Sequence, residues 1–366
     1  MLFRSLGGIE LHLRDLALAL RSEGCDARIV TPTPGDPLVD GVEVDRLSVA
    51  RMPGGEFAVS PRLAARCREA FAKARADVVH AHVSLVSPTG IVAAIAARSM
   101  GLPVVVTFHS MLDSATLLMR LADTFSGWSR GGVVLTAVSR ALARQVSVGA
   151  RGAEVSVLPN GVRPSFWMTA AKRGATASDS IVAVSAMRLN ARKRPLALIA
   201  AYARARERAR AAGRRLELRV AGDGPLRARL TAEIARLDLE GEARLLGAVS
   251  RNALVDLYAE ADFFVLPSIR ESFGIAALEA RCAGLPVVAM RGSGAEDFLS
   301  DKSNALLAAD DAALAAGMAR LTVDDALRSR LAPPDSALEA YDWTRVARAH
   351  LACYDRAREI AARRGK

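Results

Sequence analysis

Two kinds of hydrophobic pattern alternate along most of the chain. Short runs of consecutive apolar residues are typical of buried strands, and apolar residues that recur every three or four positions are typical of amphipathic helices. The first half therefore predicts strands at Ala27–Thr31, Asp77–His82, Val104–Phe108, Gly132–Ala137 and Val155–Leu158. It also predicts helices at Glu10–Ser22, Pro61–Ala74, Gly90–Met100 and Arg140–Val146.

The same alternation resumes in the second half of the chain. Strands are expected there at Ile181–Ala186, Leu216–Ala221, Ala243–Leu246, Asp262–Leu266 and Pro286–Ala289. Strands that alternate with helices predict an α/β fold with parallel, doubly wound sheets. The small and polar segment Lys172–Ser180 is the expected linker. We therefore expect two Rossmann-like domains, at residues 1–170 and 171–340, that face a ligand-binding cleft.

The end of the chain, residues 341–366, predicts one more helix. Asp342 or Thr344 can cap its N-terminus. Val346, His350 and Tyr354 lie on one stripe of this helix, which is expected to run to about Ala362.

Composition and charge narrow the classes of function. Although 51% of the residues are hydrophobic, no run of eighteen consecutive apolar residues occurs, so we expect no membrane-spanning helix. The four cysteines lack metal or disulfide spacing, and residues 1–4 lead into no apolar run, which together favour the cytoplasm. Aromatic residues are only 5% of the chain, which disfavours nucleic-acid binding. The net charge of +11 leaves peripheral contact with an anionic membrane open.

The segment from Pro267 to Val288 carries the most specific pattern. It predicts a polar loop after a strand, then a short helix and a second strand, with Gly274 at the start of the helix. Unpaired N–H groups at that helix start can bind a phosphate. Glu271 and Glu279 would stand roughly 10 Å apart at about 1.5 Å rise per residue. That separation suits two sugars joined by a diphosphate, and it exceeds the about 5 Å expected for the two acids of a retaining glycosidase.

Two basic side chains follow the first strand of the second domain. Arg188 and Lys193 can neutralise a diphosphate and stabilise the charge on a leaving nucleotide. The alternative is a solvated, charged helix start, because residues 188–215 contain ten basic side chains and one acidic side chain. The arginines from 204 to 210 are interpreted as surface residues.

These motifs together resemble the Glu-x7-Glu region of the retaining, GT-B-fold glycosyltransferases of group 1, family four. The turn Gly222-Asp223-Gly224-Pro225 is similar to the family's Gly-x-Gly-Pro turn, and Met187 replaces the usual glycine before Arg188. The resemblance implies that Glu271 contacts the hydroxyls of the transferred sugar and Glu279 the ribose. The other donor contacts that it implies are Arg188, Lys193, Gly247, Ser272, Phe273, Gly274 and Ile275.

The first domain carries a second set of residues that resemble the family pattern. Gly7-Gly8 is similar to the Gly-Gly loop, so the amides around Gly8 would approach the donor phosphates. His109 matches a histidine near the transferred sugar, and its imidazole is expected to be exposed at a strand end. His80 and His82 also close a strand, where one of them can line the acceptor side. No third ligand of suitable spacing joins these two, so no metal site is expected.

Two further expectations concern the ends of the first domain. The family's first apolar strand precedes the Gly-Gly loop by about ten to fifteen residues, whereas this chain starts six residues before it. We therefore expect the first domain to lack that central strand, or to keep a remnant of it at Met1–Arg4. By the same resemblance, the helix at residues 341–366 would pack back on the first domain.

The implied activity is transfer of a sugar from a UDP-, GDP- or ADP-sugar to an acceptor hydroxyl, with retention of configuration. Glu271, His109, Arg188 and Lys193 would act at the reacting centre without a metal or another cofactor. The acceptor (a glycan, a glycolipid or a small polyol) stays open, and its contacts are expected in loops at Pro32–Pro37 and Met111–Ser126. Two alternatives also stay open, a nucleotide-sugar 2-epimerase and a non-catalytic sugar-nucleotide-binding protein.

Overall fold

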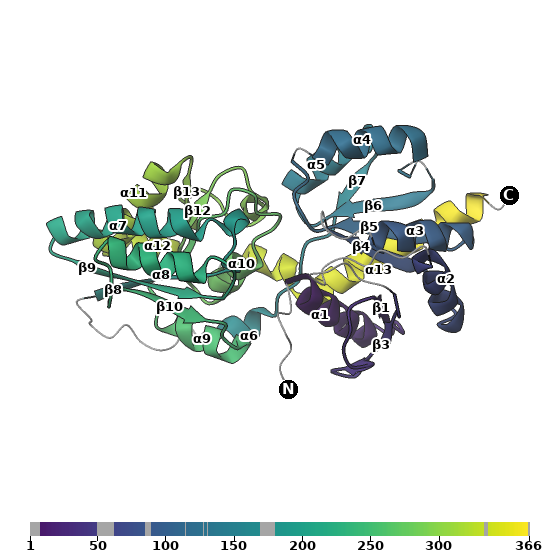
Figure 1. Ribbon diagram of the computed structural model, residues 1–366, viewed down its shortest axis with the longest axis horizontal. Helices are drawn as coiled ribbons and strands as arrows, with labels where there is room; N and C mark the ends of the chain where they lie inside the picture. Colours follow the sequence, from purple (N-terminus) through teal and green to yellow (C-terminus); the bar gives the residue numbers. More distant parts are fainter. Residues whose placement is uncertain are drawn as a thin grey trace. The chain divides into compact units, whose positions relative to one another are not determined.

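The chain folds into two compact units, each of mixed helices and parallel strands (Figure 1). The computed structural model describes residues 8–49, 62–84, 89–113, 115–126, 128–129, 131–168, 180–332 and 336–364. Unit 1 consists of Met1–Gly161 and Ala340–Lys366, and unit 2 consists of Val162–Glu339. The expected division at residue 170 lies a few residues after the one observed, because α6 (Pro164–Met168) packs against a helix of unit 2.

Unit 2 is built on a six-stranded sheet in which all neighbouring strands are parallel. The strands lie in the order β10-β9-β8-β11-β12-β13. Their bounds are Ser180–Ala186 for β8, Arg215–Ala221 for β9, Ala243–Gly247 for β10, Phe263–Leu266 for β11, Val287–Met290 for β12 and Ala305–Ala308 for β13. This is the doubly wound order of a Rossmann fold, and its direction of winding changes between β8 and β11.

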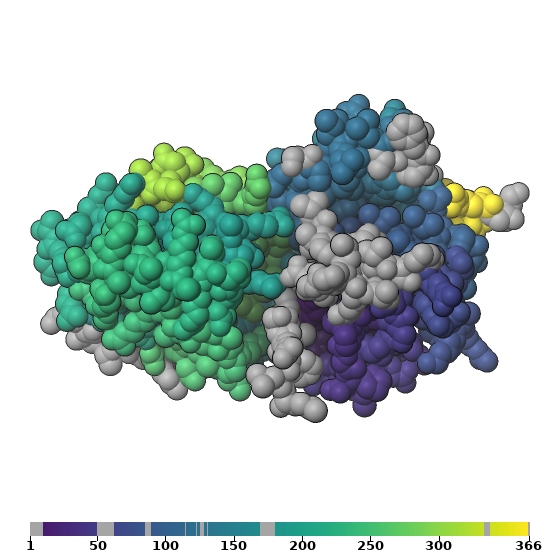
Figure 2. Space-filling model, in the orientation of Figure 1, coloured from purple at the N-terminus to yellow at the C-terminus, as the bar shows by residue number. Residues whose placement is uncertain are grey.

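Helices cover both faces of the unit 2 sheet. Successive residues of a strand point to opposite faces: Phe263 and Val265 of β11 enter a core shared with α7, α8, α11 and α12, whereas Phe264 contacts Tyr258 of α9. Figure 2 shows the side formed by α7 and α8, in teal to green. The helices are α7 (Pro195–Ala211), α8 (Arg227–Arg236), α9 (Arg251–Ala259), α10 (Ile275–Cys282), α11 (Asp311–Val323) and α12 (Asp325–Leu331), with 3-10 turns η2 (Ala191–Lys193) and η3 (Gly294–Asp297).

Unit 1 contains two sheets that are not joined to one another among the described residues. A four-stranded parallel sheet has the order β4-β5-β6-β7. A three-stranded sheet has the order β1-β3-β2, in which β1 and β3 are parallel and β2 and β3 antiparallel. The bounds are Ile29–Thr31 for β1, Leu38–Val39 for β2, Val42–Arg46 for β3, Val79–Val83 for β4, Val104–Phe108 for β5, Val133–Ala137 for β6 and Val155–Val157 for β7.

The last helix, α13 (Trp343–Arg364), packs on α1, β5 and β6 of unit 1. Its residues Ala347, Tyr354 and Ala357 share a core with Leu16 and Leu20 of α1. Asp342 caps the helix by accepting a hydrogen bond from the backbone N–H of Thr344 at 2.9 Å. The other helices of this unit are α1 (Gly8–Ser22), α2 (Leu63–Lys73), α3 (Thr89–Ser99), α4 (Ala115–Ser126) and α5 (Arg140–Gly149), and the 3-10 turn η4 (Ser336–Tyr341) precedes α13.

Several sequence-based expectations need correction or lie outside the described residues. The segment Met111–Ser126 is not a loop, because most of it forms α4. Ser180 belongs to β8 rather than to the linker, since it pairs with Arg215 of β9. The expected remnant strand at Met1–Arg4 lies outside the described residues, and so do Gly7 and the rest of the expected linker, residues 172–179.

Candidate functional site

The predicted diphosphate-binding residues lie where the winding of the unit 2 sheet changes direction. β8 and β11 are adjacent parallel strands, so their carboxyl ends open at the same edge of the sheet. Arg188 and Lys193 follow β8, and Glu271 follows β11. In open α/β sheets, ligands bind in the crevice outside the carboxyl ends of the strands at such a switch point. The fold therefore brings these three residues to one end of the sheet.

Lys193 and Glu271 form a direct ion pair at this edge. The ammonium Nζ of Lys193 lies 2.6 Å from Oε2 of Glu271. The Glu271 side chain is only 7% exposed and that of Lys193 33% exposed. The turn that carries Lys193 is fixed, because the side chain of Asn190 accepts a hydrogen bond from the Lys193 backbone N–H at 3.1 Å. Such a pair offers a cation and an acceptor of hydroxyl protons at one point.

The start of α10 provides backbone donors beside that pair. Gly274 is the N-cap residue at φ +90°, and no side chain at this position caps the helix. A Cβ atom there would lie 3.2 Å from Cβ of Ala295, so both conformation and space favour glycine. Uncapped N–H groups at a helix start attract anions. The backbone around Gly274 thus has the geometry of a phosphate-binding helix start.

The side chains next to Gly274 differ in their exposure to solvent. Ser272 and Ile275 are half-buried, whereas Phe273 is buried with its ring 5.5 Å from that of Phe298. Because the Phe273 side chain belongs to the core, a contact between Phe273 and a donor would come from its backbone. Side chains of Ser272 and Ile275 remain accessible at the helix start.

Glu279 lies two turns along α10 and is buried. The carboxylate Oε1 lies 3.7 Å from Nη2 of Arg251, whose guanidinium also lies 5.7 Å from the centroid of the Trp167 ring. Burial raises the pKa of Tyr258 well above its usual value, and the negative charge of Glu279 raises it further. Glu279 is therefore a buried carboxylate that lies close to Arg251 and interacts electrostatically with Tyr258, both of α9.

The glycine-rich turn after β9 supports the loop that carries Arg188. The backbone N–H of Leu189 donates to the carbonyl of Asp223 at 2.9 Å. A Cβ atom on Gly222 would lie 1.8 Å from the carbonyl oxygen of Met187, and one on Gly224 would lie 2.6 Å from that of Leu189. Both glycines are required because two backbone segments pass in contact there. Arg188 itself is exposed.

Gly247, the predicted base contact, ends β10 next to this turn. It has φ +75°, and its carbonyl accepts a hydrogen bond from the Gly222 N–H at 2.7 Å. The positive φ is a conformation that favours glycine. Gly247 therefore belongs to the same backbone network as the turn that supports Arg188.

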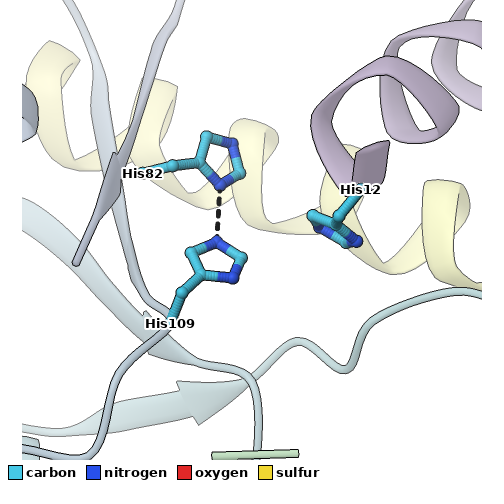
Figure 3. Close-up of side chains that lie close together, drawn as sticks. All are labelled: His12, His82 and His109. Atoms are coloured by element: carbon cyan, nitrogen blue, oxygen red, sulfur yellow. Dashed lines mark hydrogen bonds between the residues drawn. The ribbon is translucent and has the colours of Figure 1, made fainter. Parts of the chain in front are cut away.

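In unit 1, His109 lies in a cluster of histidines rather than at an exposed strand end. Figure 3 shows His82 of β4, His109 just after β5 and His12 of α1 turned toward one another. His82 Nδ1 and His109 Nε2 are hydrogen-bonded at 2.8 Å. The ring centroids of His12 and His109 are 5.3 Å apart. The imidazole of His109 is buried, so the expectation of an exposed imidazole is wrong.

The two remaining histidines of the chain adjoin this group. The His80 ring lies 4.0 Å from that of His82 and 5.5 Å from that of His350, between centroids. His80 Nδ1 is hydrogen-bonded to the Tyr354 hydroxyl at 2.9 Å, and His80 Nε2 to the hydroxyl of Thr107 at 2.6 Å. All five histidines of the sequence thus lie in one region of unit 1.

Burial keeps these imidazoles uncharged. Desolvation, with additional repulsion from neighbouring histidines, lowers the pKa values of His12, His80 and His82 well below the usual value. The same causes lower the pKa of His109 to about 3, and burial lowers that of His350 to about 4. Neutral imidazoles carry a free lone pair each, so the cluster is a set of nitrogen donors and acceptors at neutral pH.

The sequence argument against a third histidine ligand is wrong. His12, His82 and His109 each offer one nitrogen, and these atoms all lie within 4.8 Å of one another. Sequence spacing missed this group because its members come from separate elements. A signal was present, since His12 lies one helical turn before Leu16 and two before Leu20, on the buried stripe of α1. Gly8, the predicted phosphate contact of this unit, begins the same helix.

None of the helices among the described residues is long and apolar enough to cross a membrane.

Comparisons with known proteins connect both units to one class of enzyme. A model of the glycosyl transferases group 1 matches residues 169–333, and a model of glycosyltransferase family 4 matches residues 6–166. A D-inositol 3-phosphate glycosyltransferase of Nocardioides sp. is 29% identical, over 96% of this chain and 86% of its own length. A glycogen synthase of Mycobacterium tuberculosis is 27% identical, over 99% and 92% of the two chains.

Solved structures show the same architecture. Anabaena Alr3699/HepE, solved in complex with UDP and glucose, has a TM-score of 0.76 at 21% identity and covers 95% of this chain and 96% of its own. Sucrose-phosphate synthase from Thermosynechococcus elongatus has a TM-score of 0.74 at 18% identity, over 95% and 93% of the two chains. At this identity the likeness shows the fold, which is GT-B with two Rossmann-like domains. Since the two family models together span nearly the whole sequence, the chain belongs to the group 1, family 4 glycosyltransferases and is a glycosyltransferase.

Proposed function

We propose that this enzyme transfers a sugar from a nucleotide-diphospho-sugar to an acceptor hydroxyl with retention of configuration and without a catalytic divalent cation. The observation that carries the proposal is the Lys193–Glu271 ion pair at the switch point of the unit 2 sheet, beside the uncapped start of α10. A cation, a carboxylate and backbone amides at one edge match the three parts of such a donor.

Each part of the donor has a candidate partner in unit 2. Lys193 and Arg188 would neutralise the diphosphate and stabilise its charge as it leaves. Glu271 would accept hydrogen bonds from hydroxyls of the transferred sugar, and Glu279 would accept them from the ribose. Backbone groups at 272–275 and Gly247 would contact the phosphates and the base. When Lys193 turns to the diphosphate, Glu271 would exchange its ion pair for the sugar hydroxyls.

From unit 1, the family resemblance assigns His109 to the transferred sugar and Gly8 to the donor phosphates. With a pKa of about 3, His109 would act at neutral pH as an uncharged hydrogen-bonding group rather than as a cation. Its Nε2 is hydrogen-bonded to Nδ1 of His82. This would position the sugar without a nucleophile on the protein.

In this mechanism the charge of the leaving diphosphate is met by side chains and helix N–H groups. The acceptor's proton would pass to an oxygen of the leaving phosphate on the same face of the sugar. We place the reaction in the cytoplasm, a placement supported by the four free cysteines, which suit a reducing compartment.

A donor panel tests the proposal. The protein is incubated with UDP-, GDP- and ADP-sugars, and nucleotide release is measured with and without an acceptor extract. Acceptor-dependent release from one donor, with retained anomeric configuration in the product by NMR, is the expected result. Conversion of the donor to its 2-epimer without acceptor would instead identify an epimerase. Thermal stabilisation by one nucleoside diphosphate with no turnover of any donor would indicate a binding protein.

A matched pair of variants ties the activity to the site. Lys193→Ala should lower acceptor-dependent release by about 10²- to 10³-fold, whereas Arg192→Ala in the same turn should leave it near that of wild type. Arg192 is exposed, and its replacement by alanine removes one positive charge from the same segment. The Arg192→Ala variant therefore controls for a general electrostatic effect. Equal loss in both variants would contradict the role given to Lys193.

A further inference from the structure

The histidine cluster of unit 1 contains three imidazoles in the arrangement of metal ligands. His12, His82 and His109 come from α1, β4 and the residue after β5, and Figure 3 shows the rings of His82 and His109 facing each other with the ring of His12 beside them. One nitrogen of each lies within 4.8 Å of the others. Nitrogen atoms that bind one tetrahedral Zn²⁺ lie about 3.3 Å apart. Side-chain rotations that shorten the nitrogen–nitrogen distances by about 1.5 Å or less would therefore bring the three atoms to the spacing of zinc ligands.

The backbone around the three histidines is well fixed. His82 lies in the β4–β5 ladder opposite Thr107, and the His109 N–H donates to the Val83 carbonyl at 2.9 Å. His12 is held because α1 packs against α13. Ligands that stand on packed elements need little reordering when an ion binds, which favours affinity.

One imidazole nitrogen of this group lacks a hydrogen-bond partner among the described residues. His12 Nδ1 is buried without a hydrogen-bond partner among the described residues, and His12 is only 5% exposed. His82 Nδ1 and His109 Nε2 bond to one another. A buried polar atom without a partner is uncommon in folded proteins, and an ion that accepts its lone pair would satisfy it.

We propose that His12, His82 and His109 form a Zn²⁺-binding site in unit 1. Three imidazoles without a thiolate or carboxylate suit Zn²⁺, in the manner of sites with three histidines and one open position. Because the three ligands are neutral, the ion keeps its full charge, and the fourth position would take an anionic ligand such as hydroxide or a phosphate oxygen.

The site has a consequence that rests on the proposed function. A Zn²⁺ ion on His109 would withdraw this imidazole from the transferred sugar, so zinc would inhibit transfer rather than support it. The site would then make the enzyme sensitive to zinc although its chemistry needs no metal. The binding site itself does not depend on this consequence.

Equilibrium dialysis of the full chain against Zn²⁺ tests the site. We expect one Zn²⁺ per chain by metal analysis, and a higher melting temperature with Zn²⁺ present. His12→Ala and His82→Ala should each lower the affinity at least as much as loss of an outer-shell partner does, about 10- to 100-fold. His350→Ala is the matched control, because His350 is a buried histidine of the same cluster outside the three ligands, and it should keep the affinity.

A measurement on the unmodified chain covers the case in which a variant does not fold. Co²⁺ in place of Zn²⁺ should give the intense visible absorption of a four-coordinate ion with nitrogen ligands. Absence of that absorption, or Zn²⁺ binding that is equal in wild type, His12→Ala and His82→Ala, would overturn the site. A loaded site that leaves nucleotide release unchanged would instead overturn the sugar contact of His109, which separates the two proposals.

Discussion

The two units use the same kind of α/β framework but place different chemistry in it. Unit 2 has one continuous six-stranded parallel sheet, and the carboxyl ends of its central strands carry opposed charges, Lys193 against Glu271. Unit 1 has its described strands in two sheets, and uncharged histidines lie at the ends of β4 and β5, with His82 half-buried and His109 buried. The same edge of a parallel sheet therefore serves ion pairing in one unit and neutral hydrogen bonding in the other.

The difference follows from how each edge is covered. In unit 2, Lys193 keeps a third of its side chain exposed, so its charge remains solvated while it pairs with Glu271. In unit 1, α1 and α13 contribute His12, His350 and Tyr354 over the strand ends, so the imidazoles lose water and lose their charge. Burial of a strand end by neighbouring helices decides whether a titratable residue there is charged or neutral. We therefore expect the two units to respond differently to pH, mutation and chelators.

Lowering the pH should reduce the unfolding free energy of unit 1 before that of unit 2. This is the largest effect that we expect. A histidine whose folded pKa is depressed stabilises the fold fully above its unfolded pKa of about 6.5. That stability is lost as the pH falls toward the folded pKa, about 4 for His350 and about 3 for His109. Each such histidine should cost about 1.4 kcal/mol of unfolding free energy per pH unit in this window.

Hydrogen exchange measured at pH 7 and pH 5 would locate that loss. Protection should fall in β4–β7 and α13 and persist in β8–β13, since residues 162–339 contain no histidine. His350→Gln should reduce the slope of stability against pH. Equal loss of protection in both units at pH 5 would show that the cluster does not control acid stability.

Lys193→Ala should lower turnover by about 10²- to 10³-fold, because a preorganised charge contact to the developing charge is lost. Steady-state kinetics with the donor found in the panel measures this. The double variant Lys193→Ala/Glu271→Gln separates catalysis from stability, since it removes the buried carboxylate that the single variant leaves unpaired. Melting temperature should recover in the double variant, whereas recovery of turnover would contradict a catalytic role for Lys193.

The two glutamates should separate binding from turnover. Glu279→Gln should weaken nucleoside diphosphate binding about 10-fold with little change in kcat, because a ribose contact is present in both ground and transition states. Glu271→Gln should lower kcat and leave the affinity for free nucleoside diphosphate near that of wild type. Calorimetry with the nucleotide and kinetics with the donor give the two quantities. Identical nucleotide affinities in both variants, each weaker than wild type, would refute the division of roles.

Chelation should have the smallest effect. Because Arg188, Lys193 and helix N–H groups are proposed to meet the diphosphate charge, acceptor-dependent nucleotide release should persist after dialysis against EDTA. Release before and after dialysis, with metal content checked by mass spectrometry, tests this. Complete loss of activity that Mg²⁺ or Mn²⁺ restores would require a catalytic metal in the donor site.

Local sequence signals were strongest where a strand is buried on both faces. β5 has the predicted bounds, Val104–Phe108, because a short run that begins with three β-branched valines favours a strand covered on both faces. Signals were weakest where non-local pairing decides the structure. The residues of β13, Ala305–Ala308, are helix-forming types, and they form a strand because they pair with β12. The helix α4 was missed, and its Leu117, Leu118 and Leu121 are exposed, so these three apolar positions face no core.

The sequence by itself determined the α/β class, the family resemblance and the candidate donor residues after β8 and β11, since these depend on apolar runs, glycine turns and motif spacing within short segments. Only the tertiary structure decided that Lys193 meets Glu271 and that five histidines gather in one region of unit 1. These contacts join residues such as His80 and Tyr354 that are far apart along the chain. No local pattern specifies them, because the pairing of strands and the coverage by α1 and α13 set both the distances and the loss of charge.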